Sequence, residues 1–245
     1  EATSPETEAS AFAFASGIRK KPVFSENAPG FIANRILGAY RRAADYLLED
    51  GASPYAIDAA MQAFGFKMGP YETLDLAGLD ISWAARRRAA AAEDGARYVR
   101  IADAFCEAGR LGQKTGKGFY DYSSGGVARE DPVALALIDA ERAKTGRRLR
   151  RISVKEIVDD CLKAMVNEGA RVLDDGIALR PGDIDAVMVL GLGFPRHRGG
   201  PMKAGELSGL LGILRSLEAR ASDDPFWSPA QALRDAVKNG NRFAP

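Results

Sequence analysis

Apolar residues recur at intervals of three and four along most of the chain, the spacing of one face of a helix. The first such run lies between Gly30 and Gly51 and carries Phe31, Ile32, Ile36, Leu37 and Tyr40. It predicts a helix over about 31–50, with Gly51 as a left-handed cap. A second helix is predicted to begin at Ser53-Pro54, because serine is a preferred N-cap and proline fits the first helical position.

Helical spacing returns after residue 150. The stretch "ISVKEIVDDCLKAMV" begins with the capping-box pair Ser153 and Glu156, and its buried face is predicted to carry Ile157, Cys161, Met165 and Val172. Residues 123–150 are predicted to be a linker that contains the helix "PVALALIDAERAKTG". Residues 1–24 predict an alanine-rich helix followed by a short strand at "KPVFSE", an order typical of the end of an α/β unit.

The two helical zones, 25–122 and 151–245, resemble each other. Each has an acidic residue and glycine at a helix end, a proline-initiated helix with Ile-Asp-Ala, a Gly-Phe turn, a Gly-Pro and a Gly-Leu helix. The matched positions keep their order: Gly51/Gly176, Ile57/Ile184, Phe66/Phe194 and Pro70/Pro201. This order favours a tandem duplication over chance similarity. We therefore predict an all-α fold of two tandem domains related by a pseudo-twofold axis.

Composition fits a soluble globular protein of 245 residues, with 46% hydrophobic residues and a net charge of +1. No run approaches the roughly 18 apolar residues of a membrane span, and the charge balance does not favour nucleic acid. The basic clusters at 86–88 and 147–151 are interpreted as solvated faces or linker, with a phosphate-bearing ligand as the alternative. Cys106 and Cys161 lack metal-site spacing, so we expect no metal and a reducing environment. The missing initial methionine suggests a processed or truncated product.

Self-sufficient active-site motifs are missing from the sequence. His197, the one histidine, has no acid at a telling spacing, and "GLGFP" is a weak dinucleotide fingerprint because it lacks the third glycine. Asn34 is the remaining candidate, since an amide both donates and accepts and lies here near the positive end of a helix dipole. It could bind a ligand carbonyl or, alternatively, hold its own helix start or a neighbouring loop.

Three motifs then carry a resemblance: "KKPVFSENAPGFIANRIL", "FGFKMGPYETLDLAGLD" and "GQKTGKGFYDY". In this order they resemble the C-terminal domain of L-3-hydroxyacyl-CoA dehydrogenases. The later stretch "MVNEGARVLDDGIALRPGDIDAVMVLGLGFPRHRGGP" resembles the second C-terminal copy of multifunctional fatty-acid oxidation enzymes, in which an enoyl-CoA hydratase/isomerase domain comes first. Residues 1–24 look like the last helix and strand of the family's NAD-binding Rossmann domain.

The resemblance implies oxidation of (S)-3-hydroxyacyl-CoA, with hydride passing to NAD. The family's His–Glu base pair and NAD loop would lie upstream of residue 1, so this fragment alone is expected to be inactive. By resemblance, Asn34 orients the 3-oxygen and the thioester of the acyl-CoA substrate. Met68, Gly69 and Pro70 are expected to line or shape the acyl pocket, although a helix-start turn also explains them. Lys114 and Lys117 are expected in a closing turn rather than at a phosphate.

The second copy is expected to have no site of its own. Counting back from the shared helix end places Asp159 opposite Asn34, and an ionised carboxylate only accepts hydrogen bonds. It would repel negative charge on a substrate oxygen, so the second copy should act as packing partner in place of a second subunit. Some multifunctional relatives carry an aromatic residue at the position of Leu190, so any contact from Leu190 to substrate would be apolar.

The preferred interpretation is the C-terminal part of a bacterial-type multifunctional β-oxidation enzyme, with a hydratase domain upstream and a thiolase subunit as a possible partner. The ending "NRFAP" lacks a peroxisomal address, which favours the cytoplasm over a peroxisomal source. Two alternatives stay open. One is a single-activity 3-hydroxybutyryl-CoA dehydrogenase with duplicated C-terminal domains, and the other is a non-catalytic helical dimerisation module.

Overall fold

The computed structural model describes residues 3–92 and 97–243. The first repeat consists of α2 (Ala33–Asp50), α3 (Pro54–Phe64), α4 (Pro70–Ala77), α5 (Leu79–Ala92) and α6 (Ile101–Glu107). The second repeat consists of α8 (Val154–Asp174), α9 (Pro181–Gly191), α10 (Pro201–Ser208), α11 (Leu210–Ala221) and α12 (Gln231–Lys238). The remaining elements are α1 (Pro5–Gly17), α7 (Pro132–Thr145), β1 (Tyr120–Asp121), β2 (Arg129–Glu130) and the 3-10 turns η1 (Gln113–Thr115), η2 (Arg196–Arg198) and η3 (Pro225–Trp227). The all-α prediction is confirmed.

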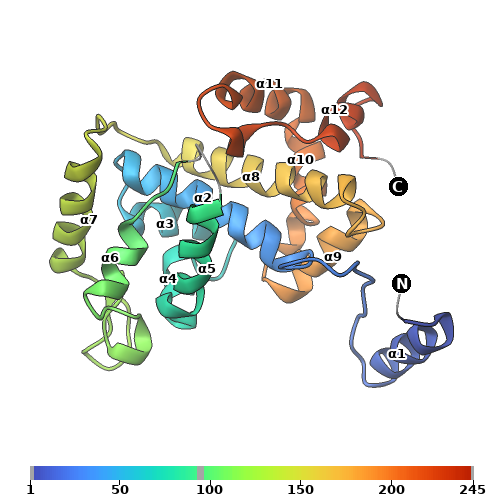
Figure 1. Ribbon diagram of the computed structural model, residues 1–245, viewed down its shortest axis with the longest axis horizontal. Helices are drawn as coiled ribbons and strands as arrows, with labels where there is room; N and C mark the ends of the chain where they lie inside the picture. Colours follow the sequence, from blue (N-terminus) through green and yellow to red (C-terminus); the bar gives the residue numbers. More distant parts are fainter. Residues whose placement is uncertain (1–2, 93–96, 244–245) are drawn as a thin grey trace.

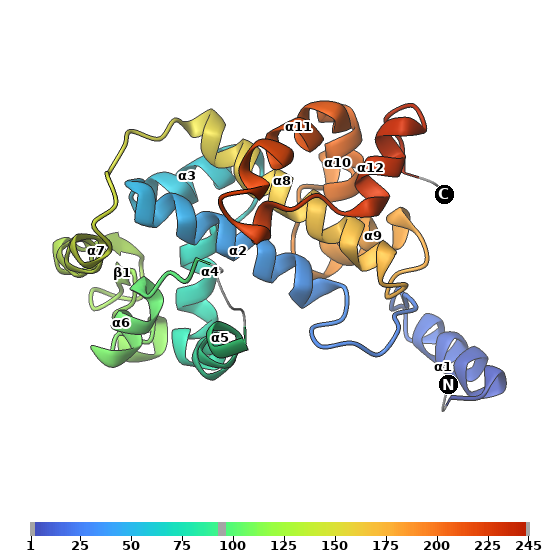
Figure 2. The ribbon, with the colours of Figure 1, turned by 45° about the horizontal axis from the view of Figure 1, so that its top comes forward.

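Helices α2 and α8 lie side by side and run in opposite directions at the centre of the molecule (Figures 1 and 2). The end of α2 meets the chain just before α8, where the Arg150 amide donates to the Asp50 carbonyl at 3.0 Å. The start of α2 meets the end of α8, where Arg35 pairs with Glu168 at 2.6 Å. Helix α3 also packs on α8, and its counterpart α9 packs on α2. The exchange of equivalent contacts is what a pseudo-twofold axis requires.

The two repeats share one local arrangement at their Ile-Asp-Ala and Gly-Pro motifs. The carboxylate of Asp58 on α3 accepts hydrogen bonds from the first free amides of α4, both at 2.9 Å. Asp185 on α9 accepts the equivalent bonds from the start of α10, at 2.8 and 3.1 Å. The matched rings of Phe66 and Phe194 contact each other with centroids 5.4 Å apart. The sequence repeat is therefore a repeat of structure.

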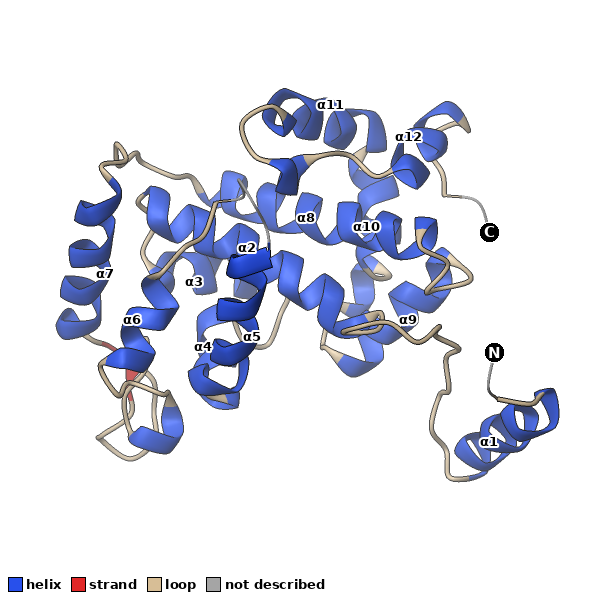
Figure 3. Cartoon of the chain, in the orientation of Figure 1, coloured by secondary structure: helices blue, strands red, loops and turns tan. Residues whose placement is uncertain are grey.

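The segment before α2 differs from the prediction. Helix α1 forms, but none of its residues is buried, and it lies apart from the rest of the molecule (Figures 1 and 3). The strand predicted at "KPVFSE" is wrong, since residues 20–26 form no strand in the structure. A strand needs a paired neighbour, and among the described residues this stretch makes a single backbone bond to the body, donated by Glu26 to the Ile177 carbonyl at 3.0 Å.

Capping signals located the helix starts closely. Ser53 accepts from the Ala56 amide at 3.0 Å and Ser153 accepts from the Glu156 amide at 3.2 Å, as predicted. The other half of the capping box is wrong, because the Glu156 carboxylate pairs with Arg150 instead. The predicted linker helix forms as α7, which packs against α2 and α6.

The hydrophobic core is continuous through both repeats. Its members on α8 include the predicted Ile157, Cys161, Met165 and Val172, all at most 1% exposed. Gly51 ends α2 with φ of +132°, as its predicted role as cap requires. The rigid α2–α8 centre therefore positions the first turn of α2, where Asn34 lies.

Candidate functional site

A cavity of about 930 Å³ runs along one side of α2. Residues of α2 from Asn34 to Tyr46 form one wall. The other walls come from the start of α4, from α5, from residues 97–102 and from Glu168 and Arg171 on α8. The lining is mainly apolar and includes Leu37, Leu74 and Ile81, with arginine side chains between them. A cavity of this size can hold a ligand of cofactor dimensions.

Asn34 lies at one end of this cavity with its side chain exposed. Its amide N–H donates to the Gly30 carbonyl at 3.0 Å, so the backbone of the first turn is fixed. Its side chain forms no hydrogen bond with any residue that the structure describes, and no side chain caps α2 at Ile32. The alternative in which Asn34 holds its own helix start therefore has no contact to support it. The side-chain amide has both its donor and its acceptor available to a ligand.

A tight turn fixes where α2 begins. Gly30 has φ of +82° and Phe31 has φ of +47°. A Cβ at Gly30 would lie 3.3 Å from both the backbone nitrogen and Cγ of Arg35. Glycine is therefore required at position 30, both for its positive φ and for this close approach.

Met68, Gly69 and Pro70 occupy different environments. Pro70 lines the cavity, whereas the lining includes neither the half-buried Met68 nor Gly69. Gly69 is buried against α3, where a Cβ would lie only 2.3 Å from Asp58. The helix-start turn thus accounts for Gly69, and of these three residues only Pro70 shares the cavity with Asn34.

The predicted positions in the second repeat lie away from the cavity. Leu190 near the end of α9 is 51% exposed and is not among the cavity residues. Asp159 forms an ion pair with Lys155, one turn earlier on α8, at 2.5 Å. Neither residue comes together with Asn34 in this cavity, and Asp159 has a partner of its own.

Two charged cavity residues, Arg41 and Asp45, were missed by the sequence analysis. The Nε atom of Arg41 is buried without a hydrogen-bond partner among the described residues, and burial lowers the pKa of its guanidinium. Burial raises the pKa of Asp45 to about 6, although the nearby Arg86 and a hydrogen bond from Tyr71 act in the opposite direction. Both lie at helical spacing from Asn34, and that periodicity was the available signal.

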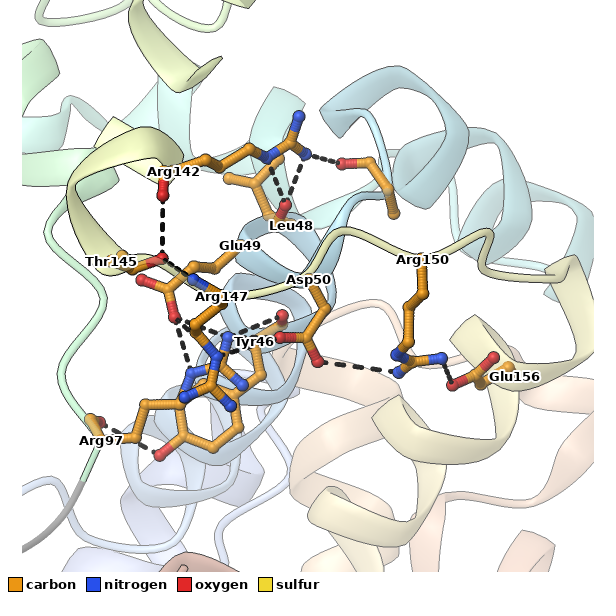
Figure 4. A network of polar contacts seen from close by, with 11 residues as sticks. Tyr46, Leu48, Glu49, Asp50, Arg97, Arg142, Thr145, Arg147, Arg150 and Glu156 are labelled. Atoms are coloured by element: carbon orange, nitrogen blue, oxygen red, sulfur yellow. Dashed lines mark hydrogen bonds and ion pairs between the residues drawn. The ribbon is translucent and has the colours of Figure 1, made fainter. Parts of the chain in front are cut away.

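Three arginines of the basic clusters, Arg86, Arg147 and Arg150, form ion pairs within the protein. Arg147 and Arg150 both approach Asp50, at 3.6 Å each, and Arg97 binds the same carboxylate at 2.6 Å (Figure 4). Arg86 pairs with Asp103 at 3.0 Å. The side chain of Arg88 lies outside the described residues. These contacts favour intramolecular ion pairs over a phosphate site.

The other candidate residues from the sequence do not line the cavity. Lys114 pairs with Asp80, and Lys117 is exposed in the turn between α6 and β1. His197 is exposed in η2, near Gly65. Both cysteines are buried and unpaired, and within residues 3–92 and 97–243 no cluster of metal-binding side chains occurs. A search of the same residues finds no helix long and apolar enough to cross a membrane.

Comparison with known proteins adds independent evidence. The family model described as "3-hydroxyacyl-CoA dehydrogenase, C-terminal domain" matches residues 30–122 and again 157–242. The chain is 39% identical to the peroxisomal bifunctional enzyme of Danio rerio over 98% of its own length and 36% of that protein. It is 34% identical to the fatty acid oxidation complex subunit alpha of Acinetobacter baumannii (strain SDF) over 99% of its length and 34% of that protein. The chain thus spans about a third of these relatives.

A solved structure supports the fold. The crystal structure of 3-hydroxybutyryl-CoA dehydrogenase from Escherichia coli K12 superposes with a TM-score of 0.77 at 24% identity, covering 98% of this chain and 66% of that one. The two family-model matches coincide with the two helical repeats seen here. The chain belongs to the 3-hydroxyacyl-CoA dehydrogenase family, as two copies of its C-terminal domain.

Proposed function

We propose that this chain supplies one wall of the substrate cleft of an NAD-dependent (S)-3-hydroxyacyl-CoA dehydrogenase. The observation that carries the proposal is the available side-chain amide of Asn34 at the end of a large cavity. An amide donor placed there can bind the 3-oxygen of the substrate and its thioester carbonyl. It stabilises the charge distribution of the reacting group without itself exchanging a proton.

The acyl-CoA substrate would be held next to α2. Pro70, Leu37 and Leu74 offer apolar surface in the same cavity as Asn34, which suits an acyl chain. Met68 and Gly69 would act on the shape of this wall through the turn before α4, and Leu190 would add at most an apolar contact. These roles stay predictions.

The residues described here do not fit NAD. A dinucleotide site of this type needs a glycine-rich turn between a parallel strand and a helix. In this chain "GLGFP" follows helix α9, and the one sheet in the described residues pairs β1 with β2 antiparallel. Hence the cofactor and the catalytic base would be supplied by an upstream Rossmann domain. The unburied α1 is consistent with a missing neighbour of this kind.

The second repeat would replace a second subunit. Its helix α8 covers α2, as an equivalent helix of a symmetry-related chain would, and Asp159 gives it no amide donor at the position matching Asn34. Longer relatives named as bifunctional enzymes or fatty acid oxidation complex subunits favour a multifunctional parent chain that includes an enoyl-CoA hydratase. A thiolase partner and a cytoplasmic location belong to the same proposal.

The decisive assay measures NADH formation from (S)-3-hydroxyacyl-CoA by this chain and by the longer chain that includes its upstream domains. We expect turnover by the longer chain and none by this chain alone. Activity of this chain alone, or a longer chain that oxidises no 3-hydroxyacyl-CoA, would overturn the proposal. Hydration of an enoyl-CoA by the longer chain separates the multifunctional form from a single-activity 3-hydroxybutyryl-CoA dehydrogenase.

A further inference from the structure

Arg35 links the first turn of α2 to the second repeat. It follows Asn34 directly, and its Nε donates to Oε1 of Glu168 at 2.7 Å. A terminal guanidinium nitrogen reaches the same oxygen at 2.6 Å, and the other reaches Asp175 at 2.6 Å. Glu168 follows Arg35 by 133 residues in the chain, and Asp175 follows it by 140. One side chain beside Asn34 is thus held by two carboxylates at the end of α8.

Because Arg35 and Glu168 are partly buried, solvent ions screen their contact less than they would screen a surface ion pair. The side chain of Arg35 is 21% exposed and that of Glu168 is 13% exposed, whereas Asp175 is 53% exposed. Glu168 also pairs with Arg171 at 3.2 Å, which fixes the carboxylate from its other oxygen. The hydrogen bonds from the Arg35 guanidinium to these carboxylates are charge-assisted and directional, so they define the position of the guanidinium.

The first turn of α2 is anchored in the core by the buried side chains of Ile32 and Ile36, and its polar contacts come from the second repeat. No side chain caps it, as described above, and in the chain that leads into it the Glu26 amide donates to the Ile177 carbonyl. Ile177 lies just beyond the end of α8, close in sequence to Asp175. Two independent contacts therefore join the start of α2 to the same end of the second repeat.

We propose that Arg35 is a positioning residue, and that Glu168 and Asp175 of the second repeat use it to set the orientation of Asn34 toward the substrate. This inference rests on the proposed function of Asn34. It gives the second repeat a defined part in the reaction, although that repeat has no site of its own. The reason is geometric, because misplacing a reacting group by about 1 Å can cost on the order of 100-fold in rate.

The test is a double-mutant cycle in the longer chain with all its domains. Glu168→Gln keeps the shape of the side chain and removes its charge, and we expect kcat to fall about 10-fold with little change in KM. In an Asn34→Ala background the same substitution should have almost no further effect, since there is no amide left to position. Arg35→Lys should retain more activity than Arg35→Met.

A matched control is the pair of exposed Arg180 and partly buried Asp183 at the start of α9, which joins the second repeat only to itself. Asp183→Asn should leave kcat unchanged. An equal loss of kcat from Glu168→Gln with and without Asn34, or no loss at all, would overturn the inference and leave the proposed function standing. If Asn34→Ala itself has no effect on kcat, the proposed function fails instead.

A second readout uses this chain alone. Hydrogen exchange at the amides of residues 34–37 should become faster in Glu168→Gln, while exchange in α4 stays unchanged. Unchanged exchange at the start of α2 would show that the ion pair does not hold that turn, and would contradict the inference regardless of catalysis.

Discussion

Asp58 and Asp185 show how single residues define both repeats. Each carboxylate satisfies amides that a helix start leaves without partners, and it lies at the positive end of that helix. The neighbouring Gly69 and Gly200 allow the approach, because a Cβ at either would lie 2.3 Å from the aspartate. In each repeat the Ile-Asp-Ala motif and the Gly-Pro motif therefore form the two sides of one contact. The similarity between the repeats points to this contact, whereas helical periodicity alone does not explain it.

The first prediction concerns Gly69→Ala. The added methyl group would collide with Asp58, so we expect the free energy of unfolding to fall by about 1–3 kcal/mol. Gly182→Ala is the control, since no atom lies within 4 Å of a Cβ there and its φ is not positive. It should be neutral or stabilising by up to about 1 kcal/mol. Chemical denaturation measures both; equal effects would contradict the packing described here.

The second prediction concerns pH. Burial raises the pKa of Asp185 to about 6 from an ordinary value of 3.8, so the folded chain keeps this proton to higher pH than the unfolded chain. Its contribution to the free energy of unfolding is fully present below about pH 4 and is lost as the pH rises through 6. Asp185→Asn should therefore flatten the decline of stability between pH 4 and 7. An unchanged slope in denaturant titrations would show that the carboxyl does not titrate as stated.

At the scale of elements, both ends of α2 are fixed by distant parts of the chain. Arg142 on α7 donates to the carbonyl of Leu48, in the last turn of α2, and to that of Ala52, just after the helix. Arg97, Arg147 and Arg150 surround Asp50 (Figure 4). The other end is held through Arg35. Both ends of helix α2 are thus fixed in position, and Asn34 lies in its first turn.

The third prediction is that Arg142→Ala destabilises the fold. Arg142 is 9% exposed, and its loss removes the side-chain donor of the Ala52 carbonyl and leaves the Leu48 carbonyl with the Gly51 amide at 3.2 Å. We expect the free energy of unfolding to fall by about 2 kcal/mol or more. Arg180→Ala removes an exposed arginine that pairs within one turn, so it should change the free energy of unfolding by less than about 0.5 kcal/mol. Thermal unfolding distinguishes the two, and a similar small effect for both would argue against the role of Arg142.

The sequence predicted local features better than distant ones. Ser53 and Ser153 mark helix starts because capping depends on residues three apart. The pairing of β1 with β2 was missed, since strands of two residues have no periodicity. The strand expected at residues 21–26 does not form, because pairing depends on a neighbouring strand and the described residues place none beside it. For the site, Asn34 stood out as an odd amide, whereas the contact between Arg35 and Glu168 joins residues too far apart for any spacing rule.

At the scale of the whole molecule, one core runs through both repeats, so neither should unfold alone. Phe194 is 1% exposed and touches the rings of Phe64 and Phe66 from the other repeat. The interface thus has the character of a domain interior. This is the expected form of a duplicated chain that encloses within itself the packing of a dimer.

The fourth prediction follows from this shared core. Phe194→Ala should lower the free energy of unfolding by about 3–5 kcal/mol, while unfolding remains a single transition. Leu207→Ala is the control, because Leu207 is 73% exposed. Calorimetry of both variants measures the change in stability and the number of unfolding transitions. Two separate transitions, with only the second repeat affected, would show that the repeats fold independently.

The central claim is that Asn34 is the residue through which this chain takes part in 3-hydroxyacyl-CoA oxidation. The most direct test is the kcat of Asn34→Ala in the longer chain, with Asn34→Asp beside it. We predict a fall of about 100-fold or more for Asn34→Ala, as for the loss of one donor to a reacting oxygen. Asn34→Asp should fall at least as far, and unfolding of this chain should be unchanged, since the side chain forms no hydrogen bond with the residues that the structure describes. A kcat within twofold of the unsubstituted enzyme would contradict the account.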